Sequence, residues 1–360
     1  MNTTNLDAPA PAPAPTLLAA TGPAAPQRKP GALDWAPVNY DLRDTWFPVS
    51  HSRDVVAQPI RRIIHAQAYF LWRDGSGVAC AAEFRPDQMS AKRHLASAFT
   101  GGSGLYPVIE RYGYIWAWYG NPEHADVLLI PHIPFVPLDG SLPGYTQRTV
   151  RFDASSALSV ENLIDLTHAD FLHAGTIGDG TADADVVEVE WTSETVTRTR
   201  MVTNKSVAPI MRWIGGVRAK FQDFRAVLHI HLRSNVCISY PRFRPGYDVP
   251  NVQPFVPVGS YRSRCDVTFN TTAAPAPFRY VMPRINYVIQ PQDNSVVRPQ
   301  SPRYFDPTER ADLHSRFDKP GNRYRLQMEQ LAARQRRGDF AYGSDAEPNR
   351  DIRSLLGMDS

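Results

Sequence analysis

Short apolar segments with strand character follow one another along most of this chain, and this repetition restricts its fold more than any other feature. Each segment is bounded by turn residues such as glycine, proline, aspartate and asparagine, which is the pattern of strands joined by tight connections. Strands of this kind pair as antiparallel neighbours and leave one face of the sheet for helices. We predict strands at 46–50, 62–64, 69–72, 78–82, 106–109, 114–118, 145–152, 186–191, 195–202, 226–232, 235–240, 262–270 and 279–289.

Helical patterns are few. Ser155 is a suitable N-cap for a predicted helix over 156–172. Two more helices are predicted near the end of the sequence, at 306–317 and at 322–337, the second followed by a glycine that suits a helix C-terminus. Few helices among many strands predict the α+β class, with helices packed on one side of a large antiparallel sheet.

The sequence predicts three parts. Residues 1–33 are rich in alanine and proline, carry too little apolar mass to fold, and are expected to form a disordered tail. Residues 34–140 hold several short strands and are predicted to form a small β domain. Residues 141–360 hold the long helical motif, the later strands and the last helices, and are predicted to form the second domain.

Composition excludes several classes of function. The chain has 39 lysines and arginines against 36 aspartates and glutamates, a net charge of +3, which is too small to indicate a nucleic-acid or anionic-membrane partner. No apolar run is long enough to span a bilayer, so no membrane partner is expected. The N-terminus lacks the pattern of a secretory signal. Three widely spaced cysteines indicate no disulfide framework and a cytoplasmic location.

One stretch carries a pattern that suggests chemistry, the string ENLIDLTHADFLH at 161–173. Asn162, Asp165 and His168 recur every three residues, so a helix places them along one side. His173 follows His168 by five residues, about 140° further round an ideal helix. Both imidazoles therefore reach one metal ion only if the helix loosens, through a π-bulge or a frayed last turn. Two neutral imidazoles with a carboxylate are the usual ligands of a ferrous ion that keeps sites open for O₂.

The full Asn-x-x-Asp-x-x-His-x-x-x-x-His string resembles the mononuclear-iron signature of Rieske-type aromatic-ring-hydroxylating oxygenases and related demethylases. Three other segments are similar to parts of the same family. The stretch 46–52 looks like the opening strand of its Rieske domain, 106–120 like the strands that close that domain, and 289–305 like the late strands and turn before its C-terminal helices. The resemblance covers about 40–355.

This resemblance implies a small Rieske-like β domain followed by a helix-grip, START-like sheet with C-terminal helices. It implies that His168 and His173 bind Fe(II) and that Asp165 bridges the iron site to a cluster on a neighbouring subunit. It also implies that Asn162 contacts the ligand side chains without binding the metal itself. The family takes its third ligand from an aspartate in a context like Asp-x-x-x-Leu-Glu-x-Gln-Gln. The stretch GNRYRLQMEQ places Asn322 at that position, with Asp318 as the alternative. A two-histidine site completed by water is a further possibility.

The chain departs from the family at the Rieske cluster, which is bound there by Cys-x-His and Cys-x-x-His. Between the framing strands stand only Cys80, His65 and His94, in neither motif. A polar, weakly helical stretch over 85–99 takes the place of the cluster loops. We therefore expect no 2Fe-2S cluster in this chain, and read both histidines as ordinary structural residues.

Two functions follow from the resemblance. The first is a mononuclear iron oxygenase component that hydroxylates, or removes an N- or O-methyl group from, a small aromatic or heterocyclic substrate. Its electrons would come from a Rieske-containing reductase or ferredoxin, as in methylxanthine N-demethylation systems that include a component without its own cluster. Asp165 favours this hypothesis. The alternative, favoured by Asn322, is a non-catalytic subunit of a hetero-oligomeric oxygenase. The family implies a trimeric or hexameric assembly.

A third hypothesis is a binding protein whose sheet cavity takes a small apolar molecule without metal. His229 and His231 alternate with apolar residues and so lie on one face of a predicted strand. They line the cavity or lie on the other face of the sheet, and we favour a structural role for both.

Overall fold

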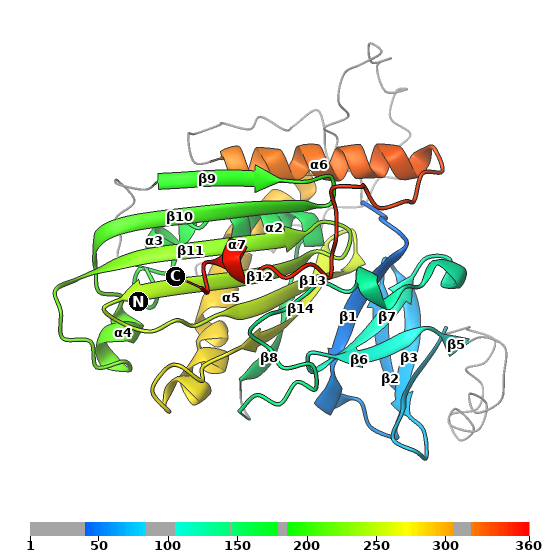
Figure 1. The fold of residues 1–360 in the computed structure, drawn as a ribbon, viewed down its shortest axis with the longest axis horizontal. Coiled ribbons are helices and arrows are strands. Elements are labelled where there is room, and N and C mark those ends of the chain that lie inside the picture. Colours follow the sequence, from blue (N-terminus) through cyan, green and yellow to red (C-terminus); the bar gives the residue numbers. More distant parts are fainter. Residues whose placement is uncertain (1–39, 84–104, 144–145, 179–185, 305–317, 360) are drawn as a thin grey trace, which may run out of the picture. The chain divides into compact units, whose positions relative to one another are not determined.

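The computed structural model describes residues 40–83, 105–143, 146–178, 186–304 and 318–359 (Figure 1). The predicted tail at 1–33, the stretch 85–99 and the predicted helix at 306–317 lie outside the described residues. The division of the folded part near residue 140 stays a prediction. Within the described ranges, no helix is both long and apolar enough to cross a membrane.

Two small antiparallel sheets come first along the chain. One has three strands in the order β1-β7-β6 and the other four in the order β2-β3-β4-β5. Trp46 of β1 and Trp118 of β7 pack edge to face with ring centroids 5.2 Å apart, a favoured geometry for aromatic pairs. The strands are β1 (Thr45–His51), β2 (Ile60–Ile64), β3 (Gln67–Arg73), β4 (Ala79–Glu83), β5 (Leu105–Tyr106), β6 (Val108–Arg111) and β7 (Tyr114–Tyr119).

A seven-stranded antiparallel sheet follows, in the order β8-β14-β13-β12-β11-β10-β9. From β9 to β14 each strand lies beside its neighbour in sequence. β8 pairs with β14 and forms the edge opposite β9. The strands are β8 (Gln147–Phe152), β9 (Val186–Trp191), β10 (Thr195–Ser206), β11 (Phe221–His231), β12 (Val236–Arg244), β13 (Asn251–Gly259) and β14 (Arg262–Phe269).

Side chains of β11 alternate between two hydrophobic cores. Leu228 and Ile230 belong to the core that the helices complete, whereas Val227 belongs to the core that contains the tryptophans of the small sheets. This alternation is the period of two expected for a strand. His229 and His231 have the parity of Val227, are both buried, and are absent from the lining of the cavity described below. The expectation that they are structural agrees with this position.

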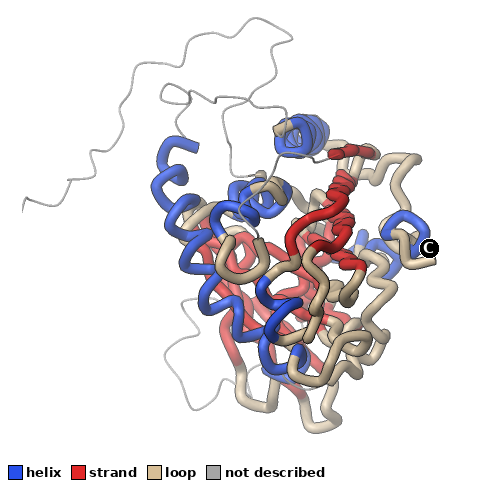
Figure 2. The backbone as a smooth tube through the Cα atoms, turned by 90° about the vertical axis from the view of Figure 1, so that its left-hand side faces the viewer, coloured by secondary structure: helices blue, strands red, loops and turns tan. Residues whose placement is uncertain are grey.

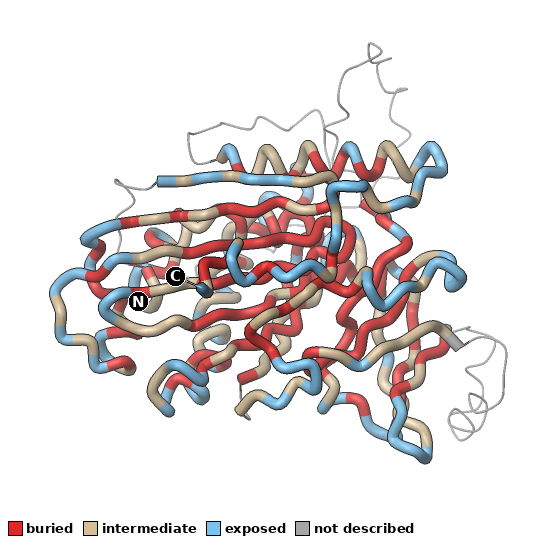
Figure 3. The backbone as a smooth tube through the Cα atoms, viewed as in Figure 1, coloured by how far each residue is buried: buried red, intermediate tan, exposed pale blue. Residues whose placement is uncertain are grey.

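The helices include α2 (Ser156–Ile164), α3 (His168–Leu172), α4 (Pro209–Trp213), α5 (Phe278–Tyr304), α6 (Lys319–Arg336) and α7 (Arg353–Leu356). Short 3₁₀ turns lie at Ser52–Asp54, Pro122–His124 and Val127–Leu129. α2 and α5 pack against strands β8, β13 and β14 of the large sheet, and Figure 2 shows helices gathered on one side of the strands, as the α+β prediction expected. Buried positions appear in Figure 3 mainly along the strands and at the faces where helices meet the sheet.

The predicted strand at 279–289 is wrong, because this stretch is the first half of α5. Four prolines stand inside α5, and each removes a helical N–H, so the sequence reads as extended. Burial outweighs this loss: Phe278, Met282, Val297 and Tyr304 are at most 9% exposed and recur on one face of the helix. Tertiary packing therefore overrides local propensity here.

Candidate metal centre and its cavity

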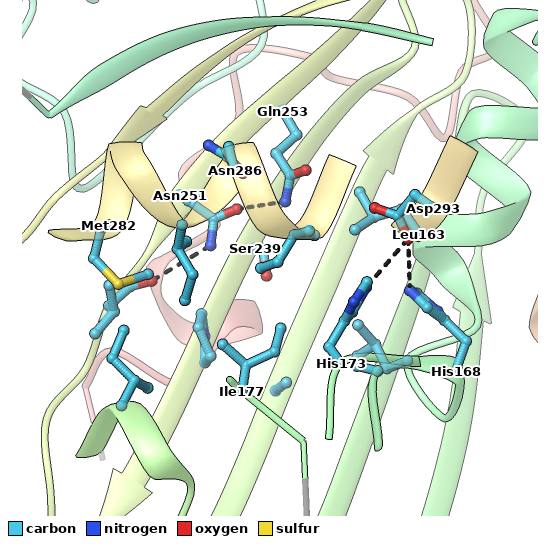
Figure 4. A pocket seen from close by; sticks show the side chains of 18 of the residues that line it. Leu163, His168, His173, Ile177, Ser239, Asn251, Gln253, Met282, Asn286 and Asp293 are labelled. Atoms are coloured by element: carbon cyan, nitrogen blue, oxygen red, sulfur yellow. Dashed lines mark hydrogen bonds and ion pairs between the residues drawn. The ribbon is translucent and has the colours of Figure 1, made fainter. Parts of the chain in front are cut away.

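Two histidines and one aspartate, contributed by α3 and α5, lie close together. His168 begins α3, His173 follows its last residue, and Asp293 lies midway along α5. The Nε2 atoms of His168 and His173 lie 3.5 Å and 3.1 Å from Oδ1 of Asp293. One ligand atom from each side chain lies within 4.8 Å of the other two, so the three converge on a single point (Figure 4).

A break in the predicted helix produces this convergence. The helix expected over 156–172 ends at Ile164 and restarts at His168. At the break, the carboxylate of Asp165 accepts hydrogen bonds from the backbone N–H, at 3.0 Å, and the hydroxyl of Thr167, which favours a turn over helix. At the start, Ser155 accepts from Leu158 N at 3.1 Å, as its predicted N-cap role requires. The loosening therefore precedes His168.

The outer nitrogen of each imidazole is fixed by an acceptor. Nδ1 of His168 donates to the backbone carbonyl of Asp165, and Nδ1 of His173 donates to Oε1 of Gln292 at 2.8 Å. A neutral imidazole has only one N–H. Both Nε2 atoms therefore present lone pairs toward Asp293, which is the arrangement of a metal-ligating histidine held by a second acceptor.

The carboxylate is held and acidified by its surroundings. Oδ1 of Asp293 accepts from the side-chain amide of Asn162 at 3.0 Å, so Asn162 contacts a candidate ligand directly. Burial raises the pKa of Asp293, but contacts with His168 and His173 outweigh it and lower that pKa to about 2. Burial also lowers the pKa of His173, and hydrogen bonds with Asp293 and Gln292 outweigh it, so its pKa lies above 6.5.

The structure brings to the two histidines a carboxylate that differs from the third ligand expected from sequence. Asn322 belongs to α6 and Asp318 immediately precedes that helix. Neither residue lines the cavity, and the carboxylate beside the two histidines is that of Asp293. The expected family context was visible elsewhere: Asp293 is followed by an apolar residue four positions later, Val297, and by Gln300 seven positions later. Prolines in this stretch concealed the helix and with it the spacing.

A buried ion-pair cluster supports α3 from the sheet, and sequence reasoning did not identify it. Asp170, in the middle of α3, pairs with Arg200 and Lys205 of β10, and each of the three side chains is at most 3% exposed. Arg200 also donates to the backbone carbonyl of Leu166 at 2.8 Å. Arg200 therefore holds the chain on both sides of His168.

The donor set fits a ferrous ion. With neutral imidazoles, two nitrogen lone pairs and a carboxylate oxygen face one another, an arrangement that a cation or added protons must satisfy. Two histidines and one carboxylate on one side of the site, with open positions on the other, form the facial triad of non-haem Fe(II) oxygenases. The residues of this chain therefore suit mononuclear iron.

The centre opens into a cavity of about 190 Å³ between the sheet and the helices. Its walls are largely apolar, with side chains that include Leu163, Ile177, Phe243 and Met282. Polar side chains lie on β12, β13 and α5, away from the imidazoles in Figure 4. A mostly apolar cavity with a few polar groups is typical of a small-molecule site.

Comparison with known proteins gives the family. Residues 152–334, just over half of the chain, match the model of the vanillate O-demethylase oxygenase C-terminal domain. The vanillate O-demethylase oxygenase subunit of Pseudomonas sp. (strain HR199 / DSM 7063) is 35% identical over 107 residues, 30% of each chain. The dicamba O-demethylase oxygenase component of Stenotrophomonas maltophilia is 27% identical over 167 residues, 37% of this chain and 48% of that protein. These matches span less than half the length of the curated relatives.

Solved structures show the same fold. The crystal structure of dicamba monooxygenase bound to dicamba has a TM-score of 0.65 at 17% identity, over 82% of this chain and 98% of the other. Pseudomonas putida CBB5 NdmA, as the QL mutant with theobromine, has a TM-score of 0.57 at 15% identity, over 82% and 92%. The fold class expected from the resemblance, a small β region followed by a helix-covered antiparallel sheet, is confirmed. The chain belongs to the vanillate O-demethylase oxygenase family of Rieske-type oxygenases.

Proposed function

We propose that this chain is a mononuclear non-haem iron oxygenase component that hydroxylates, or removes an N- or O-methyl group from, a small ring-containing substrate. The observation that carries the proposal is the convergence of His168, His173 and Asp293 at one end of an apolar cavity. A binding protein of the same fold would need no such group, because three electron-rich side chains facing one another are costly without a cation.

Iron bound by these three side chains would supply O₂ activation, in which one oxygen atom enters a C–H bond and two electrons and two protons reduce the other to water. The chain itself supplies position and solvent exclusion. Arg200 and the turn at Asp165 hold α3, and Asn162 orients the carboxylate of Asp293. The apolar walls hold a ring beside the centre and keep bulk water away.

The electrons are proposed to come from a Rieske cluster on another protein. Two of the three cysteines, Cys237 and Cys265, are buried in strands of the large sheet. Cys80 alone stands in the region of the small β sheets. A Rieske centre needs two cysteines and two histidines, so the sequence supplies too few cysteines there. A Rieske-containing reductase or ferredoxin is therefore the proposed donor.

Asp165 is the proposed point of entry for these electrons. Its side chain is partly exposed and its backbone carbonyl accepts from Nδ1 of His168. This contact gives a hydrogen-bonded route from the surface to a ligand of the centre. A trimeric or hexameric assembly, as in the family, is proposed to place the donor beside it.

The alternative of a non-catalytic subunit loses its main support. It rested on Asn322 replacing the acidic ligand, whereas Asp293 supplies a carboxylate at the centre. The alternative and the proposed function make opposite predictions for iron content, so one measurement separates them.

The test is the iron content of the full chain after anaerobic loading with Fe(II) and removal of excess metal. Wild type should retain close to one iron per chain, and His168→Ala and Asp293→Ala should each lose most of it. Asn322→Ala and Asp318→Ala are matched controls and should retain iron. Wild type without iron, or an Asn322→Ala variant that loses it while Asp293→Ala keeps it, would contradict the proposal.

A further inference from the structure

Four polar side chains form a distinct region of the cavity wall, which we call the amide cluster: Ser239 on β12, Asn251 and Gln253 on β13, and Asn286 on α5. We propose that the amide cluster selects an uncharged, single-ring substrate that carries a carboxamide or lactam group, and discriminates against the corresponding carboxylate. This inference rests on the proposed function, because it says which protein groups bind the part of the substrate that lies away from the metal centre.

Three members of the cluster are brought together by the sheet. Ser239 and Asn251 are cross-strand partners, and Asn251 and Gln253 lie two apart on one strand and so on one face. Gln253 Nε2 donates to Asn251 Oδ1 at 2.8 Å, and Asn251 Nδ2 reaches the carbonyl of Val249 at 3.4 Å. These bonds orient the sheet amides. The hydroxyl of Ser239 and the carbonyl oxygen of Gln253 complete a neutral wall that can both donate and accept.

Asn286 approaches from the helical wall. Its Nδ2 atom is buried and has no hydrogen-bond partner among the described residues. A buried amide donor without an acceptor is unfavourable, and a bound carbonyl oxygen would relieve it. In Figure 4, Asn286 and Gln253 both lie on the side of the cavity away from His168 and His173. A substrate carbonyl can therefore meet Asn286 while the rest of the ring extends toward the centre.

The charged side chains that line the cavity balance in number, with Arg200 and Lys205 against the carboxylates of Asp170 and Asp293. Arg200 and Lys205 both pair with Asp170, so a substrate carboxylate would compete with a buried carboxylate already in place. Asp293 adds a second carboxylate to the lining. A carboxylate substrate would also lose its hydration on entering an apolar cavity. An amide of the same shape avoids these costs and uses both its N–H and its C=O.

Cavity size limits the substrate to one ring. A cavity of about 150 Å³ lined by apolar residues accommodates benzene. The cavity here is about 190 Å³, which leaves room for one ring with small substituents. A matched pair of probes is available at this size, 4-hydroxy-3-methoxybenzamide and 4-hydroxy-3-methoxybenzoate, which have nearly the same shape and differ in charge.

The test is calorimetric titration of the full chain with each probe at pH 7, before and after loading with iron. Wild type should bind the amide at least about tenfold more tightly than the acid, the factor expected for one net hydrogen bond. Asn286→Leu, which keeps the volume and removes the donor, should abolish that preference. Gln300→Leu, an exposed change in the same helix, should leave it unchanged.

Equal or tighter binding of the acid by wild type, failure of wild type to bind the amide, or an unchanged preference in Asn286→Leu would overturn the inference. If Asn286→Leu does not fold, Asn286→Asp gives the same test, because it replaces the amide donor by an acceptor. Neither probe needs iron to enter the cavity. A protein that prefers the amide but binds no iron would therefore count against the proposed function alone. A protein that binds iron but does not prefer the amide would count against this inference alone.

Discussion

Replacing Asp293 by asparagine in the metal-free protein should destabilise the fold at pH 5 and have almost no effect at pH 9. The Nδ1 atoms of both imidazoles donate to fixed acceptors, so Nε2 carries a proton only in the imidazolium form. At pH 5 a protonated imidazole faces the carboxylate and attracts it. At pH 9 a lone pair faces the carboxylate, and an asparagine amide can donate to that lone pair instead.

The structure gives the magnitude. A lowering of the Asp293 pKa from 3.8 to about 2 corresponds to about 2 kcal/mol of stability, and solvent screening is slight because the side chain is 9% exposed. This contribution comes from the pairing of the carboxylate with protonated imidazole, so it is present above pH 3.8 and is lost as pH falls through about 2. It is also lost as pH rises through the folded pKa of His173, because a neutral imidazole no longer attracts the carboxylate. The raised pKa of His173 stabilises the fold below pH 6.5, and this contribution is lost as pH rises through its folded pKa. The charge pair is therefore present at pH 5 and absent at pH 9.

The assay is urea unfolding followed by tryptophan fluorescence, in EDTA, at both pH values. Asp293→Asn should lose about 2 kcal/mol of unfolding free energy at pH 5 and less than about 0.5 kcal/mol at pH 9. Asp153→Asn, at an exposed aspartate, should match wild type at both. An Asp293→Asn penalty of equal size at the two pH values would refute the assignment of the Nε2 lone pairs to the centre.

Three further outcomes are expected from chemical unfolding and proteolysis. Asp170→Asn should lose about 3 kcal/mol of unfolding free energy, because it leaves two buried cations, Arg200 and Lys205, without their shared carboxylate. The exposed control Glu190→Gln should leave stability unchanged, and an Asp170→Asn variant as stable as wild type would disprove the role of the cluster. Gly120→Ala should cost about 2 kcal/mol or more, since φ is +144° and a Cβ would lie 2.0 Å from Oδ1 of Asp44, while Gly75→Ala meets nothing within 4 Å and should be tolerated. Arg233→Met should remove the bidentate partner of buried Glu194 and the donor to the backbone carbonyls of Phe340 and Ala341. Limited proteolysis should then cut near residue 340 faster than in wild type, and an unchanged cleavage rate would argue against the role of Arg233 in holding this segment.

Much of the sheet could be predicted because strand alternation is a local property. The predicted strand 186–191 coincides with β9, and the predictions at 195–202 and 262–270 fall on β10 and β14. The omission of β13 has a physical cause, since Pro254 and Pro257 lie within it and proline is rare inside strands.

The candidate centre was predictable only in part. The string that carries His168 and His173 is continuous in sequence, so its spacing could be recognised. Asp293 lies 120 residues beyond His173 in a proline-rich stretch whose helical state depends on packing against the sheet. Asp170 and Arg200 pair only through the fold, and no local pattern indicates that they meet.

The shortness of α3 has a consequence for how the protein opens. Five residues are far fewer than the roughly 12 that an isolated helix needs to persist in water, so α3 is ordered only by what surrounds it. Local unfolding of this segment should therefore need less free energy than any other opening near the centre, and it would release both histidines together. Bound iron would then stabilise the folded form of this small cooperative unit and slow amide hydrogen exchange around 165–178. Amide exchange in the seven-stranded sheet would still report global unfolding.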